Sequence, residues 1–130
     1  MAVAEITIDL SRDSRLNDFS QQIIKERYLI PGETSPQEAF ARAAWAFCGG
    51  DAALGQRLYD YVSQGYFMFA TPLLSNGGTE RGLPISCFLN SVEDSRGGIL
   101  SHYAETGWLA SVGGGVGGHW GFLRSNEETT

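Results

Sequence analysis

Glycine is unevenly distributed along this chain, and its clusters constrain the fold more than any other feature of the sequence. Of the 130 residues, 17 are glycine, and most of them crowd into the segments 76–82, 97–98 and 113–121. Glycine loses more backbone freedom on folding than any other residue, so such clusters mark tight turns or backbone that must lie against a ligand. The second half of the chain is therefore expected to contain one or both of these features.

The N-terminal segment carries weaker patterns. Residues 4–10, AEITIDL, alternate between apolar and polar side chains and predict a short strand or an extended arm. A helix is expected to begin at Asp13 or Ser14 and to end at Pro31-Gly32. Its apolar face is expected to consist of Leu16, Phe19 and Ile23.

The clearest local signal is the sequence Ser-Pro-Gln-Glu at residues 35–38. It forms a capping box with proline at the first helical position. The helix that follows is expected to end at Gly49-Gly50, and Asp51 is expected to cap another helix that ends at Gly65. In the first of these helices Phe40, Ala43, Ala44 and Phe47 follow at helical spacing. In the second, Leu54, Leu58, Tyr61 and Val62 are expected to face inward. The two helices are expected to form an antiparallel pair.

After Gly65 the sequence favours extended backbone. Residues 66–74, YFMFATPLL, are expected to be extended because of the Thr-Pro step, and residues 83–89 are expected to form a strand buried on both faces. A helix is expected to begin at Asp94 or Ser95, followed by another strand at about 115–124. These strands would leave unpaired edges. The chain is therefore interpreted as part of a larger fold whose missing strands lie on another polypeptide.

Composition excludes several classes of protein. The net charge of −6 argues against a general nucleic-acid or anionic-membrane surface, and no apolar run approaches the ~20 residues of a membrane span. The start of the chain does not resemble a secretory signal, and the two cysteines form no CxxC motif. A reduced, cytoplasmic protein without a structural disulfide is expected. A metal site is not expected, because His102 and His119 lack ligand-like spacing.

The chemistry-bearing residues each have two interpretations on local sequence. Cys87 is either a small core residue or a thiol beside a polar pocket lined by Thr71 and Ser86. The glycines of 113–118 form either a flexible loop or backbone that a ligand approaches closely. They match a dinucleotide-binding fingerprint formally, but that motif needs a following helix, and only twelve residues follow Gly118. The sequence therefore does not favour a Rossmann fold.

Four short blocks, taken in order, resemble the large catalytic subunit of ribonucleotide reductases. They are FATPLLSNGGT, SCFL, EDS and GGGVGG, and the resemblance is close over residues 66–121 and looser over residues 28–65. It implies a mixed α/β fold, in which a helical N-terminal region, residues 1–65, leads into the first strands of a ten-stranded α/β barrel, residues 66–130. The barrel would be incomplete in this chain, and the family's ATP-cone domain has no counterpart in it.

The resemblance also implies a function and a set of site residues. Ribonucleotides would be reduced to deoxyribonucleotides by thiyl-radical chemistry, with Cys87 as the first cysteine of the redox pair. The expected substrate-binding residues are Thr71, Ser86, Gly114 and Gly115. Asp94, Ser95 and Arg124 are expected at a site for an allosteric deoxynucleotide or ATP.

The resemblance further implies partners. The thiyl-radical cysteine, its companion asparagine and glutamate, and the remaining redox cysteines are expected on a C-terminal polypeptide, so the chain should not turn over alone. No cofactor is expected on this chain, and the radical would come from a metal-containing small subunit or from adenosylcobalamin. A dimer through the effector-site helix is expected. Two alternatives stay open, namely a non-catalytic effector-binding or regulatory module, and a purely structural helical domain with a core cysteine.

Overall fold

The chain divides into two compact units. The computed structural model describes residues 6–125, and the units are Met1–Pro84 (unit 1) and Ile85–Thr130 (unit 2). Residues 66–84 pack with unit 1 in this division. The domain boundary that the resemblance predicts after residue 65 stays a prediction.

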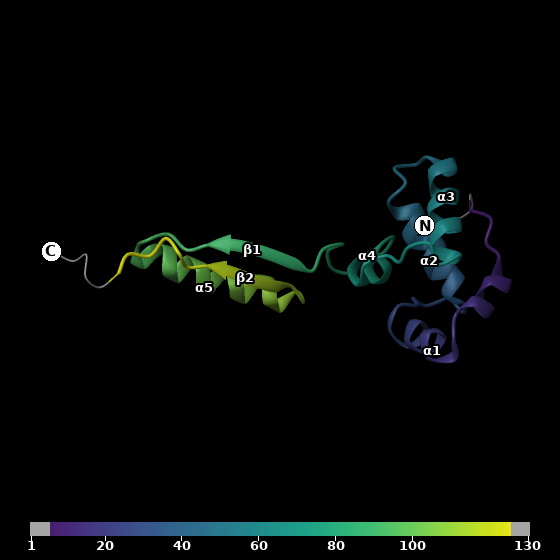
Figure 1. The fold of residues 1–130 in the computed structure, drawn as a ribbon, viewed down its shortest axis with the longest axis horizontal. Helices are drawn as coiled ribbons and strands as arrows, with labels where there is room; N and C mark the ends of the chain where they lie inside the picture. The colour runs from purple at the N-terminus through teal and green to yellow at the C-terminus, as the bar shows by residue number, and fades with distance from the viewer. Residues whose placement is uncertain (1–5, 126–130) are drawn as a thin grey trace. The chain divides into compact units, whose positions relative to one another are not determined.

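Unit 1 is helical (Figure 1). Its elements are a 3-10 helix η1 (Leu10–Arg15), α1 (Asp18–Arg27), α2 (Pro36–Ala46), α3 (Ala52–Ser63) and α4 (Thr71–Asn76). No strand forms within residues 6–10, and the rest of the predicted N-terminal strand or arm lies outside the described residues.

The capping box of α2 is confirmed. The side chain of Ser35 accepts a hydrogen bond from the backbone N–H of Gln37 at 3.1 Å. The carboxylate of Glu38 accepts from the N–H groups of Ser35 at 2.9 Å and Thr34 at 2.6 Å. The first orphan donors of the helix are thus satisfied locally, which places the start of α2 independently of distant contacts.

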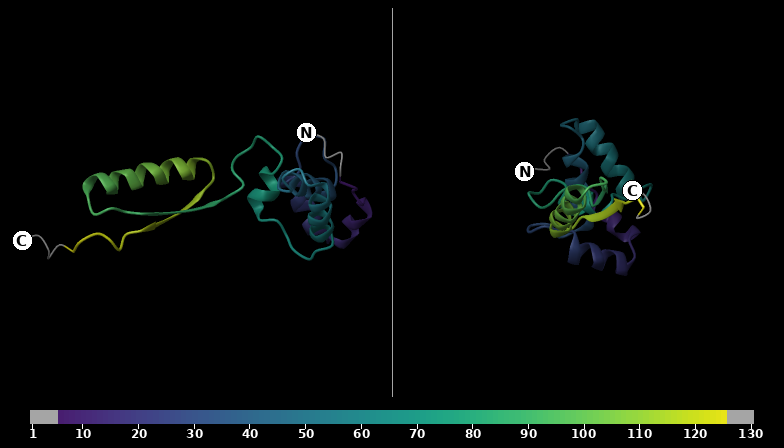
Figure 2. Two further views of the ribbon diagram at one scale, coloured as in Figure 1. Left: turned by 90° about the horizontal axis from the view of Figure 1, so that it is seen from above. Right: turned by 90° about the vertical axis from the view of Figure 1, so that its left-hand side faces the viewer.

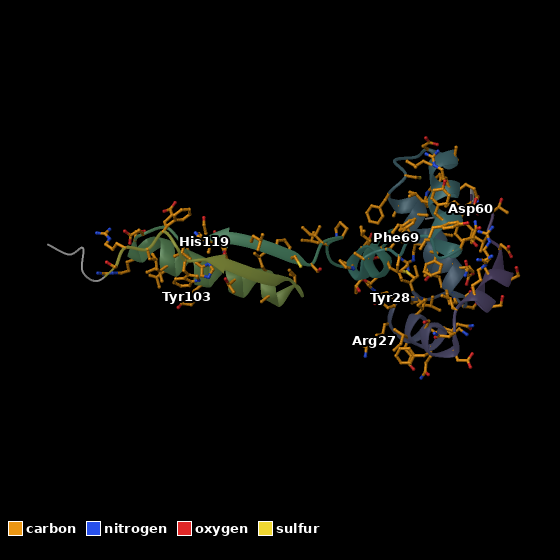
Figure 3. All side chains as sticks on the ribbon, in the orientation of Figure 1. Arg27, Tyr28, Asp60, Phe69, Tyr103 and His119 are labelled. Carbon is orange, nitrogen blue, oxygen red and sulfur yellow. The ribbon has the colours of Figure 1, made fainter. Side chains whose placement is uncertain are left out.

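The core of unit 1 is built around α2 (Figure 3). Tyr28 and Phe69 are among the partly buried residues that pack against it. The buried cluster consists of Ile6, Ile24, Ala39, Phe40, Ala41, Ala43, Ala44, Tyr59, Val62 and Leu74. The run of alanines lets neighbouring elements approach α2 closely from more than one side.

The predicted contact between α2 and α3 is present, but the inward face of α3 differs from the expectation. Asp51 caps α3 as predicted, accepting from Leu54 N at 3.0 Å. Tyr61 is 48% exposed, whereas Tyr59 is fully buried. The hydroxyl of Tyr59 accepts from the N–H of Asp9 at 2.8 Å and donates to Gln37 at 3.2 Å. These two partners compensate the burial of the phenol, which apolar spacing alone does not reveal.

Two further expectations in unit 1 are wrong. The helix expected from residue 13 or 14 is divided into η1 and α1, because Asn17 caps a new start by accepting from Ser20 N at 2.8 Å. Phe19 is consequently 72% exposed, and Ile24 is buried instead. The segment expected to be extended over 66–74 becomes helical from Thr71, because proline is tolerated in the first turn of a helix.

Unit 2 holds two strands and one helix. The strands β1 (Cys87–Ser91) and β2 (Gly115–His119) pair in parallel, and α5 (Arg96–Ser111) connects them and lies along them (Figures 1 and 2). The order of strand, helix and strand is confirmed, with Ser95 as the helix cap. The bounds of the strands differ from the expectation, since β1 begins only at Cys87 and β2 ends at His119. Burial of the first strand on both faces is wrong, since Leu89 is 89% exposed. Within unit 2, α5 packs against this sheet.

No helix within residues 6–125 combines the length and the apolar character that a membrane crossing requires.

We expect the α2 capping box to make the stability of unit 1 depend on pH. The N–H groups of Thr34 and Ser35 hold the pKa of Glu38 below its ordinary value of 4.5. A lowered folded-state pKa stabilises the fold above pH 4.5, and this stabilisation is lost as the pH falls through the folded-state value. Glu38→Gln should lower the free energy of unfolding by about 1 kcal/mol at pH 7 and by less at pH 3, as measured by urea denaturation.

The matched control is Glu80→Gln, because Glu80 is exposed and its carboxylate has no hydrogen bond among the described residues. Equal losses for Glu38→Gln at both pH values would contradict the prediction.

Candidate functional site

The parallel pairing of unit 2 brings Cys87 next to the glycine-rich strand. Cys87 begins β1 and lies opposite Gly115, the first residue of β2. The N–H of Gly115 donates to the carbonyl of Ser86 at 2.7 Å. The hydroxyl of Ser86 and the sulfur of Cys87 are 3.9 Å apart. A thiol, a hydroxyl and side-chain-free backbone thus share one edge of the sheet.

The thiol of Cys87 is exposed, whereas that of Cys48 is buried. The interpretation of Cys87 as a core residue is therefore wrong for the described chain, whereas Cys48 lies in the interior of unit 1. Cys48 is 4% exposed, and its sulfur donates to the carbonyl of Trp45 at 3.2 Å. Both cysteines are free in this structure.

The two glycines of the predicted substrate site differ in whether the structure around them has room for a side chain. A Cβ on Gly114 would lie 2.7 Å from the ring of Phe88 and 2.8 Å from the carbonyl of Leu109. Packing within unit 2 therefore explains Gly114 without any ligand. A Cβ on Gly115 would meet only the carbonyl of Ser86, at an ordinary 3.5 Å. Gly115 thus leaves open backbone beside Cys87 that local packing does not require.

Thr71, the remaining predicted substrate residue, belongs to unit 1. It is the first residue of α4 and is exposed. Its hydroxyl lies 3.3 Å from the hydroxyl of Tyr28. The structure thus brings Ser86, Cys87, Gly114 and Gly115 together within unit 2 and places Thr71 in unit 1.

The three residues predicted to meet an effector lie at the N-terminal end of α5. The side chain of Ser95 accepts from Gly98 N at 2.9 Å and caps the helix. Arg124 Nε donates to Asp94 Oδ2 at 2.6 Å, although the two residues are 30 positions apart in the chain. This ion pair is exposed, so solvent screens it, and Arg124 would have to share or leave Asp94 to bind a phosphate. A hollow of about 390 Å³ is lined by Ser95, Gly97, Gly98 and His102, and also by the carboxylate-bearing residues Glu93 and Glu105. Asp94 and Arg124 are not among its lining residues.

Comparison with known proteins identifies the family. A family model described as "Ribonucleotide reductase, all-alpha domain" matches residues 14–82. The chain belongs to the ribonucleotide reductase large-subunit family.

The relatives of this reductase chain are large subunits. It is 42% identical over 124 residues to the ribonucleoside-diphosphate reductase large subunit of Invertebrate iridescent virus 3, covering 95% of this chain and 20% of that protein. It is 31% identical over 134 residues to the large subunit of Trypanosoma brucei brucei, covering 95% of this chain and 16% of that protein. The chain therefore spans a fifth or less of the length of these relatives.

A solved structure supports the same family. The alpha subunit of the class Id ribonucleotide reductase of Actinobacillus ureae matches with a TM-score of 0.72 and 31% sequence identity, covering 95% of this chain and 23% of that one. Helices followed by a small parallel sheet thus match part of a reductase alpha subunit.

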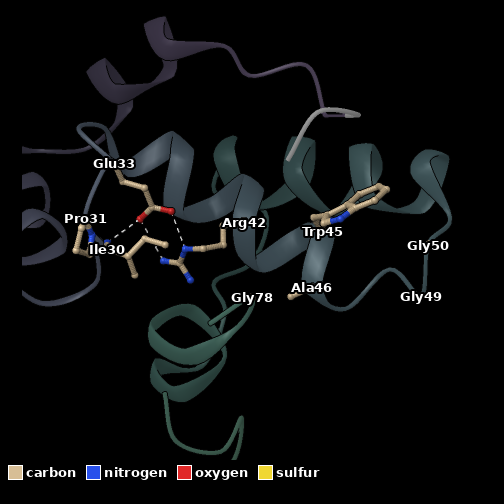
Figure 4. Close-up of a pocket in the computed structure, with 10 residues that line it drawn as sticks. Ile30, Pro31, Glu33, Arg42, Trp45, Ala46, Gly49, Gly50 and Gly78 are labelled. Carbon is tan, nitrogen blue, oxygen red and sulfur yellow. Dashed lines mark hydrogen bonds and ion pairs between the residues drawn. The ribbon is translucent and has the colours of Figure 1, made fainter. Parts of the chain in front are cut away.

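Sequence reasoning missed a buried ion pair in unit 1 of this reductase chain. Arg42 and Glu33 are joined at 2.6 Å, with side chains 5% and 11% exposed (Figure 4). They line a cavity of about 550 Å³ together with Trp45 and the backbone of several glycines. The available signal was an arginine flanked by Ala41 and Ala43 inside an otherwise apolar helical run. A charge in such a place needs a partner.

Sequence reasoning also did not reveal the packing of His102. It is 8% exposed, and its ring is in edge contact with that of Trp120 at 4.9 Å between centroids. A Cβ on Gly118 would collide with the His102 ring, so packing explains this glycine too. Within the described chain, His102 Nδ1 is buried without a hydrogen-bond partner.

The difference in exposure predicts a difference in thiol reactivity. In the native chain, iodoacetamide should modify Cys87 at least about tenfold faster than Cys48, because access to the sulfur limits the reaction. Mass spectrometry of peptides after timed labelling measures both rates. In concentrated urea the two rates should converge, and Cys87→Ser should remove the fast phase. Similar native rates for the two cysteines would refute the assignment of exposure.

Proposed function

We propose that this chain is the N-terminal part of a ribonucleotide reductase catalytic subunit, and that it reduces ribonucleotides once assembled with a C-terminal polypeptide. The observation that carries the proposal is the pairing of Cys87 with Gly115. It sets an exposed thiol beside backbone that a sugar can approach without meeting a side chain. Family membership supports the reaction class, since the relatives are named as ribonucleoside-diphosphate reductases.

In the proposed reaction Cys87 supplies one of two thiols. Replacing the 2′-hydroxyl of a ribonucleotide by hydrogen releases water and consumes two electrons and two protons. Two thiols supply these when they become a disulfide. Cys48 is buried in unit 1, so the second thiol would come from the C-terminal polypeptide, which would also carry the radical cysteine. Ser86, Thr71 and the Gly114-Gly115 backbone would hold the substrate.

The exposed sheet supports assembly with another polypeptide. In the described chain β1 and β2 pair only with each other, and Leu89 points to solvent. Additional strands would pair with the free edges and bury this face, completing the proposed ten-stranded barrel. Residues 1–65 would then form the helical region, and residues 66–130 the first part of the barrel.

Regulation and radical supply are further parts of the proposal. Asp94, Ser95 and Arg124 would bind a deoxynucleotide or ATP effector, in a dimer formed through α5. The radical would be generated outside this chain, by a metal-containing small subunit or with adenosylcobalamin. A cytoplasmic location fits the reduced state that Cys87 requires.

Reconstitution tests the catalytic proposal. The chain is mixed with the C-terminal polypeptide of a reductase large subunit, a radical-generating system, a dithiol reductant and a ribonucleotide, and deoxynucleotide formation is measured. Cys87→Ser should abolish turnover, because serine cannot supply the redox thiol, whereas Cys48→Ser should retain most of it. Unchanged turnover in Cys87→Ser would exclude the proposed role of Cys87.

A second candidate function is a non-catalytic module that binds a nucleotide effector. The meeting of Asp94, Ser95 and Arg124 at one end of α5 favours it, because these residues come together without any partner chain. This candidate predicts effector binding by the isolated chain and no turnover with any C-terminal polypeptide.

Calorimetry with deoxynucleoside triphosphates tests this cluster. Arg124→Ala should weaken binding by about tenfold, because a charge-assisted contact to phosphate is lost. Arg81→Ala, at an exposed arginine of unit 1, is the matched control and should leave the affinity unchanged. Equal affinities for the two variants would remove Arg124 from the effector site.

A further inference from the structure

Arg42 uses its whole hydrogen-bonding capacity inside unit 1. Its Nε donates to Glu33 at 2.6 Å, and its Nη2 donates to the same carboxylate at 3.3 Å and to the carbonyl of Tyr28 at 3.0 Å. Its Nη1 donates to the carbonyls of Leu74 at 3.1 Å and Gly77 at 2.6 Å. A guanidinium has five N–H donors, so none is left for a ligand in the adjoining cavity. The function of Arg42 must therefore lie in what it holds.

The first element that Arg42 holds is the C-terminal end of α4. This helix has only six residues, too few to be stable alone, and its last carbonyls have no partner within the helix. Arg42 satisfies two of the carbonyls in this region. Gly78 adopts a positive φ of 72° and a Cβ there would lie 2.9 Å from Arg42 Cγ, so the glycine pair of the loop allows this close approach.

The second element is Tyr28, the C-cap of α1. Arg42 donates a hydrogen bond to the backbone carbonyl of Tyr28. The phenol hydroxyl of Tyr28 lies 3.3 Å from the hydroxyl of Thr71. That distance is longer than the usual ~2.5–3.0 Å of an O–H···O bond, so this contact is weak. Glu33 keeps the guanidinium in place, and it also accepts from Ile30 N at 3.0 Å (Figure 4). One buried side chain thus fixes both the helix that bears Thr71 and the tyrosine beside the Thr71 hydroxyl.

We propose that Arg42, held by Glu33, is a positioning residue that sets the Thr71 hydroxyl for substrate by fixing α4 and Tyr28. The part of this inference that concerns substrate rests on the proposed function, in which Thr71 binds the ribonucleotide. Arg42 itself touches no substrate.

Hydrogen exchange on the 130-residue chain tests the first half of the inference. Arg42→Lys keeps the charge but cannot reproduce the planar five-donor fork. The amides of Leu74 and Gly77, which close the turns of α4, should exchange about tenfold faster than in wild type, while those of α3 change less than about twofold. Arg57→Lys, on the exposed surface of α3, is the matched control.

Two outcomes would overturn this half. In one, the exchange of Leu74 and Gly77 in Arg42→Lys equals that in the control. In the other, α4 and α3 accelerate together, which indicates a general loss of stability. Should Arg42→Lys fail to fold, Glu33→Gln replaces it, because it weakens the alignment of Arg42 without removing the guanidinium. Its expected acceleration at α4 is smaller and again local.

Kinetics of the reconstituted enzyme test the second half. Arg42→Lys and Tyr28→Phe should each raise the KM for ribonucleotide severalfold and leave kcat within about twofold, because binding geometry changes and the redox thiols do not. In a Thr71→Ala background the same substitutions should have no further effect on KM. Tyr66→Phe, at an exposed tyrosine, is the control for Tyr28→Phe.

An additive effect in the Thr71→Ala background would overturn positioning through Thr71. A KM unchanged by Thr71→Ala would remove Thr71 from the proposed substrate site, and with it the substrate half of the inference. The exchange measurement would still decide whether Arg42 holds α4.

Discussion

The parallel pairing of β1 with β2 is the constraint on which the chemistry-bearing part of the molecule depends. Two parallel strands cannot be joined by a tight turn, so a crossover is needed, and α5 provides it. Because the strands are parallel, both begin at one end of the sheet and both finish at the opposite end. Cys87 and Gly115 meet at the first end, and the segments carrying Asp94 and Arg124 leave from the second. The four residue steps from Cys87 to Ser91 separate the two ends of the sheet by roughly 13 Å.

This arrangement explains how one small unit can bring two separate groups of predicted site residues together. The thiol edge is nearly free of side chains where Gly115 lies, while the opposite edge gathers a carboxylate, a guanidinium and a helix N-terminus. The glycines of residues 114–118 fall into two groups, according to whether packing inside unit 2 requires the absence of a side chain. Gly114 and Gly118 are required by the rings of Phe88 and His102, whereas Gly115 is left open.

Unit 1 depends on a different interaction, the buried pair of Arg42 and Glu33. A buried ion pair repays its desolvation only when the remaining donors and acceptors are satisfied. All five donors of Arg42 find acceptors, and three of these are backbone carbonyls of Tyr28, Leu74 and Gly77. The pair therefore joins α2 to the ends of two other helices.

Predictions from the sequence were accurate where a few neighbouring residues decide the structure. Ser35 with Glu38, Asp51 and Ser95 cap their helices as expected, because capping bonds span two to four residues. Apolar spacing was less reliable. It placed Phe19 and Tyr61 inside, but the Asn17 cap divides the first helix, and Tyr59 is buried with hydrogen bonds to Asp9 and Gln37.

The sequence by itself determined the starts of α2, α3 and α5, the glycine-rich segments and the resemblance to the reductase large subunit. Only the tertiary structure decided which distant residues meet: Cys87 with Gly115, Asp94 with Arg124, and Arg42 with the end of α4. The physical reason is the separation in sequence between the residues that interact. Caps and turns arise from bonds within a few residues, whereas strand register and the partners of a buried charge depend on how separate segments pack together.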